Sequence, residues 1–497
     1  MPTVNLSEKH PQFSYQSTNW ILMRDAYRGQ RQVKSKRTLY LPATSGQIAD
    51  GMNSADQPGW KSYEAYLMRA RFPNFVREAV QTAVGMMHSQ PPKISLPSEL
   101  EGIRSSKGEN LPQLLRRINE EQLITGRVGI LADVSTSQAE PLPYLATYSA
   151  ERLINWDDGT TEGLVPQTLN FVVLDESEYE RNSLSFGWEI AEKYRVMYIG
   201  GLSTNEPSGR YRVGVFDSRE VVFEESSLTT PSIRGRELDK IPFVIVNSCD
   251  LVSDTDEPPL LDLGELCYTI YRGEADYRQN LFMQGQDTLV VVGGAQDEDE
   301  QLRTGAGARI DVPIGGDAKY IGVESDGLSE QREALTQDRS RAGSMGAQSL
   351  DTVSRERESG TSLNIRIAAR TADLNQIADT GAQALENILR ISAEWVGANP
   401  DEVSVEPNKE FGDAQLTGQS MVEQQTARNL GYPISARSLH RHAFDKGLTT
   451  MTFEEEIGEA KKERDTIFAP GEKGDRTPEQ SGVTPVNPQS DSGTTEE

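Results

Sequence analysis

The chain has 497 residues, of which 50 are Lys or Arg and 76 are Asp or Glu, so its formal net charge is −26. This excess of acid argues against a free-standing basic nucleic-acid binder, because neutralising phosphates requires a basic face, but it leaves room for a few local basic contacts. The length allows roughly two to four domains of about 100–200 residues each. No apolar run reaches the ~18 residues of a transmembrane helix.

The cysteines and the N-terminal residues predict the kind of compartment in which the protein is found. Two cysteines cannot build a disulfide framework, and we expect Cys249 and Cys267 to be buried thiols in a reducing environment. The first residues lack a basic segment followed by an apolar core, so we expect no signal peptide. The chain is therefore expected to be soluble and to stay inside a cell or a particle.

The first third of the chain is predicted to be mainly helical. A helix is expected over 12–30 with a stop at Gly29, followed by a polar linker over 34–62. Residues 62–90 give the clearest helical period, because their apolar side chains recur every three or four positions, with a kink or restart at Pro73. A further helix is expected over 111–124.

Between 128 and 247 the pattern changes to short β-branched or aromatic runs that turn residues separate. This spacing predicts antiparallel strands. The expected strands are 128–134, 169–176, 193–200, 210–217 and 241–247.

After Pro258 and Pro259 the pattern is helical again. A helix over 260–284 and a polar helix over 328–345 flank an insert that begins with a strand at 288–294. A loop or broken helix over 346–361 leads into a long helix over 362–397. Beyond it we expect a short strand at 403–407, helices at 418–430, 435–446 and 453–465, and disorder from 468 onward, where large apolar residues almost vanish.

The helix over 328–345 is polar on nearly all sides, and such a helix cannot sit in the core of a monomer. It needs neighbours that accept polar contacts. One arrangement is a ring in which each subunit packs this hairpin against the next, with one polar face lining a channel. The other is an exposed hairpin without a partner, and the pattern alone does not decide between them.

Enzyme motifs are scarce. The P-loop, HExxH, GxSxG and GxGxxG patterns are absent, so we expect no catalytic residue, no cofactor and no metal. His440 and His442 are two residues apart, which points them to different sides of a helix. The acidic run 297–300 has Leu302 where a calcium loop needs glycine, and the glycines around 305–307 favour a plain turn.

The candidate binding residues are arginines in and after the 346–361 loop. Arg355 and Arg357 alternate with glutamates, which fits either a mobile loop that touches a polyanion or a salt-bridged surface turn. Arg366 and Arg370 lie four apart on one helix face, so they either add phosphate contacts or pair with Asp373.

The order of these pieces resembles the portal proteins of tailed bacteriophages, in particular an HK97-like branch often described only as a domain of unknown function. The resemblance covers about residues 12–465. It rests on the order and spacing of stretches without a catalytic signature, namely 40–42 (YLP), 63–92, 123–134, 241–247, 258–294 and 355–362.

The resemblance implies an α+β, portal-like architecture of wing, stem, clip and crown. The mixed α/β wing is expected in 1–257 and 362–417, the latter with a long helix. The remaining parts are the stem helices 258–285 and 328–345, a small α/β clip at 286–327, a tunnel loop at 346–361, a helical crown at 418–467 and a disordered acidic tail at 468–497.

The resemblance further implies a ring of about twelve copies at one vertex of the capsid. Double-stranded DNA passes through such a ring during packaging and ejection, whatever its sequence. The implied partners are other copies of the chain, the terminase motor, the major capsid protein, and head–tail adaptor or tail proteins, with no membrane. The implied location is the portal vertex of the virion, and the host cytoplasm during assembly.

A mainly acidic wall suits a DNA conduit, because it repels phosphate and keeps the duplex centred. A few arginines at the constriction can still make transient backbone contacts. The candidates are Arg355 and Arg357, then Arg339 and Arg341 of the second stem helix, and Arg366 and Arg370. The alternatives are another virion component, such as a head–tail adaptor or minor capsid protein, and an enzyme such as a hydrolase with paired carboxylates.

Overall fold

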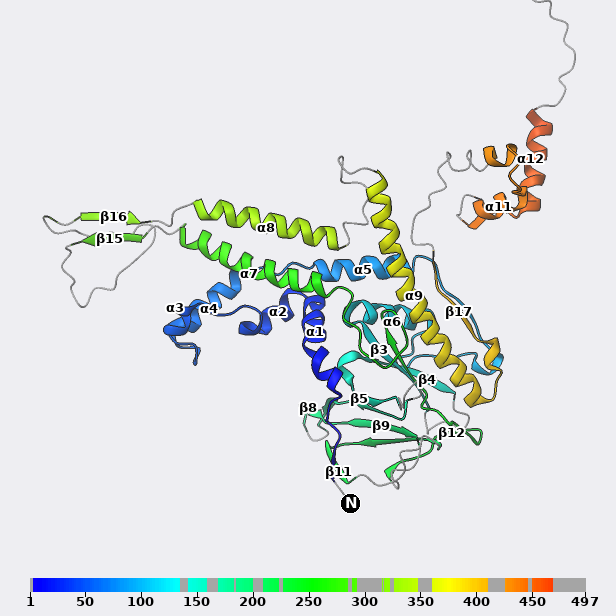
Figure 1. The fold of residues 1–497 in the computed structure, drawn as a ribbon, viewed down its shortest axis with the longest axis horizontal. Helices are drawn as coiled ribbons and strands as arrows, with labels where there is room; N and C mark the ends of the chain where they lie inside the picture. Colours follow the sequence, from blue (N-terminus) through cyan, green and yellow to red (C-terminus); the bar gives the residue numbers. More distant parts are fainter. Residues whose placement is uncertain are drawn as a thin grey trace, which may run out of the picture. The chain divides into compact units, whose positions relative to one another are not determined.

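The computed structural model describes thirteen stretches of the chain, which fall into two units, Met1–Phe411 and Gly412–Glu497. Helices and small antiparallel sheets make up the first unit, so the fold is α+β as expected (Figure 1). The expected loop 346–361 lies almost entirely outside the described residues, as do most of 286–327 and the tail from 468. The described residues are 3–134, 142–158, 169–182, 185–199, 209–222, 227–284, 288–292, 315, 317–321, 326–346, 360–409, 425–445 and 449–467.

The chain begins with a group of helices. The predicted stop at Gly29 is confirmed, since this residue caps the first helix with a φ of 83°, a conformation that glycine adopts without a steric penalty. The helices are α1 (Pro11–Arg28), α2 (Gln30–Ser35), the 3-10 turn η1 (Arg37–Leu39), α3 (Ser45–Ala49), α4 (Pro58–Arg69) and α5 (Phe75–Met87).

Two expectations about this region are corrected. The polar linker expected over 34–62 contains α3, which Thr44 and Gln47 start with a reciprocal capping box, and the first turn of α4, which opens at Pro58. The apolar period over 62–90 belongs to two helices, since α4 ends at Arg69 and α5 starts again after Pro73, as the proline suggested.

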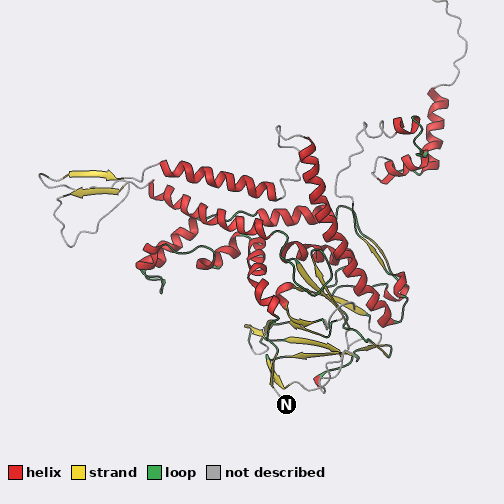
Figure 2. Ribbon diagram, in the orientation of Figure 1, coloured by secondary structure: helices red, strands yellow, loops and turns green. Residues whose placement is uncertain are grey.

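The first unit contains two larger antiparallel sheets (Figure 2). All five strands predicted between 128 and 247 are confirmed, as is the strand predicted at 403–407. One sheet has the order β14-β3-β4, and the other has the order β10-β9-β6-β5. The strands are β3 (Arg127–Val134), β4 (Pro143–Ser149), β5 (Leu153–Asp157), β6 (Phe171–Asp175), β9 (Tyr194–Ile199), β10 (Tyr211–Phe216) and β14 (Phe243–Asn247).

Smaller elements complete the first unit. Four strand pairs are β1 (Thr3–Asn5) with β11 (Glu220–Val222), β7 (Glu178–Arg181) with β8 (Trp188–Ala191), β12 (Ser232–Ile233) with β13 (Arg236–Glu237), and β2 (Lys93–Ser95) with β17 (Ser404–Glu406). Helix α6 (Leu111–Thr125) confirms the helix predicted over 111–124. Three short 3-10 turns are η2 (Ser98–Leu100), η3 (Ala150–Arg152) and η6 (Pro400–Glu402).

The long helix α9 (Gly360–Val396) joins the helices to the sheets. It packs on β3 and β14 and also contacts α5 and α6. Trp395 near its end is fully buried, and its ring lies edge-on to Tyr211 of β10 at a centroid distance of 6.3 Å. The helix predicted over 362–397 is thus confirmed.

A helical hairpin extends from this body (Figure 1). Helix α7 (Leu261–Gln284) and helix α8 (Asp326–Met345) lie side by side, and between them in the chain β15 (Thr288–Val292) pairs antiparallel with β16 (Asp317–Ile321). At ~1.5 Å per residue, the 24 residues of α7 span about 36 Å. The two predicted helices and the strand between them are confirmed.

The second unit contains α11 (Ala436–Asp445) and α12 (Phe453–Ile467), which confirm two of the helices predicted there. A helical turn at 425–429 is the described part of the helix predicted over 418–430.

The cysteines differ from expectation. Cys267 is buried in α7, and burial raises the pKa of its thiol to about 12. Cys249 is exposed, because it lies in the loop after β14, where the side chain of Asp256 accepts a hydrogen bond from its backbone N–H. The prediction of two buried thiols is therefore wrong for Cys249.

Candidate functional site

The α7–α8 hairpin is the feature that the sequence singled out, and α8 is its most unusual part. Among the α8 residues whose burial is described, only Leu335, Ala342 and Gly343 are buried. Leu335 packs against Gly273 of α7, where an added Cβ would lie 3.0 Å from the leucine side chain. The rest of α8 is exposed or half-buried, so this polar helix lies outside the core, as its sequence predicts.

Polar contacts hold α8 against α7 in addition to the apolar contacts of Leu335 and Ala342. Glu274 of α7 is only 3 % exposed and forms ion pairs with two arginines, Arg278 one turn further along α7 and Arg339 of α8. Nearer the far end of the hairpin, Asn280 donates a hydrogen bond from Nδ2 to Oε1 of Gln331 at 3.1 Å. A buried carboxylate needs such partners, because an unpaired buried charge is costly.

The opposite side of α7 is anchored to α4. The hydroxyl of Tyr66 donates to the carboxylate of Asp276, and Nη1 of Arg69 donates to Oε1 of Gln279 at 2.8 Å. The Arg69 guanidinium also lies 3.5 Å from the ring centroid of Phe282. Helix α7 is therefore held on one side by the body of the unit and on the other by α8, and most α8 side chains remain exposed among the residues that the structure describes.

Both hairpin helices carry more acid than base. Helix α7 has four acids and two arginines, and α8 has four acids and three arginines. Because Glu274 binds two of those arginines, much of the basic charge is used inside the hairpin. The outer surface of the hairpin therefore presents a mainly acidic face.

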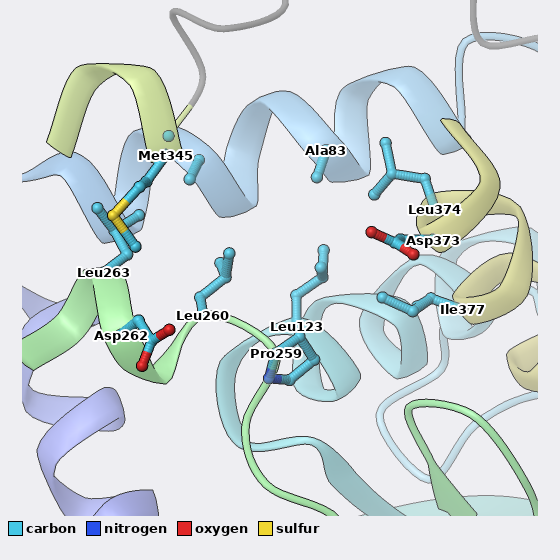
Figure 3. Close-up of a pocket in the computed structure, with 12 residues that line it drawn as sticks. Ala83, Leu123, Pro259, Leu260, Asp262, Leu263, Met345, Asp373, Leu374 and Ile377 are labelled. Atoms are coloured by element: carbon cyan, nitrogen blue, oxygen red, sulfur yellow. The ribbon is translucent and has the colours of Figure 1, made fainter. Parts of the chain in front are cut away.

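An apolar pocket of about 250 Å³ lies where the hairpin meets the body (Figure 3). Helices α5, α6, α7, α8 and α9 all contribute to its wall. Most of its side chains are aliphatic, and Asp262 and Asp373 are the only charged residues that line it. The lining holds no histidine, cysteine, serine or lysine, and its two carboxylates come from α7 and α9.

A chain of polar side chains connects the elements beneath the hairpin. Nε2 of His88 lies 2.9 Å from Oδ1 of Asn119, whose Nδ2 donates to Oε1 of Gln122 at 2.9 Å. Gln122 in turn donates from Nε2 to the backbone oxygen of Asn247 at 2.8 Å. Burial lowers the pKa of His88, which favours its neutral form in this chain of contacts. These bonds tie α5, α6 and β14 together.

The loop that leads into α7 is held by a buried arginine. Arg127 of β3 is fully buried and donates to the backbone oxygens of Ser253 and Asp254, both at 2.8 Å. Its guanidinium also lies 4.4 Å from the ring centroid of Trp156. Because residues 248–257 immediately precede α7, this arginine helps to set where the hairpin leaves the body.

The six candidate arginines fall into three groups. Arg355 and Arg357 lie outside the described residues, and for Arg366 and Arg370 the structure describes only the backbone, which belongs to α9. Arg341 is exposed on α8. Arg339 faces Glu274 across the hairpin and is half-exposed.

Sequence reasoning missed the residues that hold this site together. Glu274 is one of 76 acids, and only its spacing of four from Arg278 on a predicted helix could have drawn attention to it. Arg127 lies in a strand of mainly apolar residues, and no pattern in the neighbouring sequence indicates that this arginine is buried.

Two further observations concern only the part of the chain that the structure describes. No three His, Cys, Asp or Glu side chains there gather in a way that could hold a metal ion. None of the helices described combines the length and apolar character that crossing a bilayer requires.

Comparisons with known proteins bear on this part of the chain. The family model "Domain of unknown function (DUF4055)" matches residues 259–396, which contain α7, α8 and α9. No curated protein matches the chain.

Among solved structures, the chain is similar to a chain in the neck of a native GTA particle computed with C12 symmetry, at 13 % identity and a TM-score of 0.37, over 80 % of this chain and 97 % of that chain. It is also similar to a chain in the neck of an empty GTA particle computed with C6 symmetry (12 %, 0.36, 81 % and 98 %). A third similar chain belongs to the virion of a native gene transfer agent particle (13 %, 0.37, 79 % and 96 %). Likeness at these TM-scores assigns no function to the chain.

Proposed function

We propose that this chain is a structural protein of a phage-like virion and, more specifically, a portal protein. Many copies close into a ring at one capsid vertex, and double-stranded DNA passes through the bore during packaging and ejection. The observation that carries this proposal is the uncovered polar helix α8, held to α7 by the buried ion pairs of Glu274.

A ring explains why such a hairpin is built from polar contacts. An exposed helix with few apolar side chains gains little from packing within its own chain. Around a ring axis, the same helix can contact the hairpin of the next copy through polar groups and present its remaining face to water in the bore. The ring also repeats each charge, so the small acidic excess of α7 and α8 becomes a strong field that keeps phosphate away from the wall.

The proposed partners follow from this role. They are other copies of the chain, in a ring of about twelve, together with the terminase motor, the major capsid protein and the adaptor or tail proteins. DNA is bound without regard to its sequence, through transient contacts with phosphates. The chain itself catalyses no reaction and needs no cofactor, because the energy for DNA movement comes from the motor.

The experiment reverses the charge of the two loop arginines in the full chain, as Arg355→Glu with Arg357→Glu. We expect rings of normal mass but impaired DNA packaging or retention, because two repulsive charges per copy would line the narrowest part of the bore. A matched control is Lys36→Glu with Lys61→Glu, which reverses two exposed charges on the helices near the N-terminus.

Genome length in purified particles and infectious titre are the measurements. A normal genome length and a normal titre in the arginine double variant would show that the 346–361 loop does not contact DNA in the channel. Absence of rings in the unaltered chain would contradict the portal role itself.

A further inference from the structure

The described part of the second unit buries little side-chain surface. Among its residues whose burial is described, Ala443 alone is buried. Large apolar side chains are exposed instead, with Leu430 at 84 %, Tyr432 at 65 % and Phe444 at 47 %. Burial of apolar surface is what offsets the entropy lost when a chain becomes ordered, so helices with this little core need contacts from outside.

Few contacts between described side chains join α11 to α12. The ring of His440 lies edge-on to Phe453 at a centroid distance of 5.4 Å, and the guanidinium of Arg437 lies 5.5 Å from the same ring. Arg437 also forms an ion pair with Glu454, and both side chains are largely exposed. Exposed pairs of this kind contribute little to stability.

The two described segments of this unit differ in net charge, since 425–445 holds three arginines and one acid, and 449–467 holds six acids and three bases. From 425 to 444 there are three arginines and no acid, which we call the basic half. From 449 to 459 there are four glutamates and no base, which we call the acidic half. The Arg437–Glu454 pair joins the halves within one chain, while Arg428 and Arg441 remain exposed in the basic half.

We propose that this unit docks onto the same unit of the neighbouring copy, so that the basic half of one meets the acidic half of the next. The exposed apolar side chains pack against the neighbouring copy and become buried in this contact. A head-to-tail contact uses two different surfaces and repeats around a closed ring, whereas a two-fold contact pairs the two halves reciprocally and closes after two copies. The inference rests on the proposed function, because a ring is what sets identical units side by side.

Charge reversal in the full chain tests this inference. Arg428→Glu with Arg441→Glu changes the charge of the basic half from +3 to −1. Glu455→Lys with Glu456→Lys and Glu459→Lys changes the charge of the acidic half from −4 to +2, and both sets leave the Arg437–Glu454 pair in place. A combined variant carries all five changes. Lys461→Glu is the control, since it alters one exposed charge of α12 outside the acidic half.

The readout is hydrogen exchange of the α11 and α12 amides in assembled rings and in dissociated chains, with ring mass measured in parallel. In the unaltered ring we expect exchange on the order of tenfold slower than in the dissociated chain, because an interface of several charge pairs and apolar contacts must open first. Each half-reversed variant should lose this protection, and the combined variant should regain it, since opposite charges meet again.

Rings whose α11 and α12 amides exchange as fast as those of dissociated chains would overturn the inference and leave the portal proposal standing. A combined variant no better protected than either half-reversed variant would also overturn it. Absence of rings in the unaltered chain would instead refute the proposed function, and the ring mass distinguishes that result from the others.

Discussion

Glu274 carries the contact between α7 and α8, since one carboxylate that is 3 % exposed binds an arginine from each helix. The carboxylate of Glu274 neutralises both Arg278 and Arg339, so the close approach of these two arginines depends on that carboxylate. Removing it leaves two guanidinium groups side by side with nothing between them. This carboxylate adds to the hydrogen bond between Asn280 and Gln331 and to the buried contacts of Leu335 and Ala342.

We expect Glu274→Gln to lower the free energy of opening of the hairpin by roughly 1–3 kcal/mol, because both arginines lose their charged partner. Hydrogen exchange of the α8 amides measures this quantity. Glu265→Gln is the matched control, since Glu265 is exposed on the same helix. Equal protection of α8 in the two variants would show that Glu274 does not hold the hairpin.

His88 gives the first unit a dependence on pH. Burial, the largest cause, lowers its pKa below the ordinary 6.5, so the folded chain resists a proton that the unfolded chain accepts. As pH falls below about 6.5, the unfolded state binds more protons than the folded state, and the free energy of unfolding decreases. His10, whose pKa burial also lowers, contributes in the same direction.

We therefore expect His88→Gln to make the free energy of unfolding less dependent on pH below 6.5, while His10 keeps part of the slope. Glutamine keeps an amide that can donate to Asn119, so stability at pH 8 should change little. Urea unfolding of the full chain at pH 5 to 8 measures both quantities. An unchanged slope in the variant would contradict the assignment.

At the scale of elements, the sequence predicts best what a long periodic pattern specifies. The stripe in α5, the continuous apolar runs of β3 and β14 and the long helix α9 were all predictable, because α5 buries one face and the two strands bury most of their residues. Helix α3 was missed since five residues held by one capping box have no period to detect. The strands β4 and β5 were missed because they lack a regular alternation of buried and exposed side chains, since half-buried residues interrupt it.

The close packing of α6 against α9 at Gly381 was also beyond sequence reasoning. An added Cβ at this glycine would lie 2.4 Å from Nδ2 of Asn119 and 2.8 Å from Oε1 of Gln122. The two helices can approach this closely only because the side chain is absent. The same two polar residues link His88 to β14, so packing and hydrogen bonding meet at one point.

We expect Gly381→Ala to destabilise the first unit by about 1–3 kcal/mol, because the methyl group displaces Asn119 and Gln122. Gly85→Ala is the matched control: Gly85 lies inside helix α5 with nothing within 4 Å of its added Cβ, so alanine should stabilise by about 0.5–1 kcal/mol. Urea unfolding distinguishes the two, and a gain in stability for Gly381→Ala would contradict the close approach.

At the scale of the whole molecule, the account rests on surfaces that a single chain leaves uncovered. Helix α8 exposes polar side chains, and the second unit exposes apolar ones together with separated charges. Sequence analysis could predict the first, because composition alone shows that α8 has no apolar stripe. It could not predict the exposed apolar side chains of the second unit, since the exposure of Leu430 or Tyr432 depends on how few contacts the described helices of that unit make with each other.

Electron microscopy of the purified full chain, with averages viewed along the symmetry axis, tests the central claim most directly. We predict closed rings with an open centre whose wall is formed by the α7 and α8 helices of successive copies. A population of single chains at every concentration, with α8 packed against the body of its own molecule, would contradict the account.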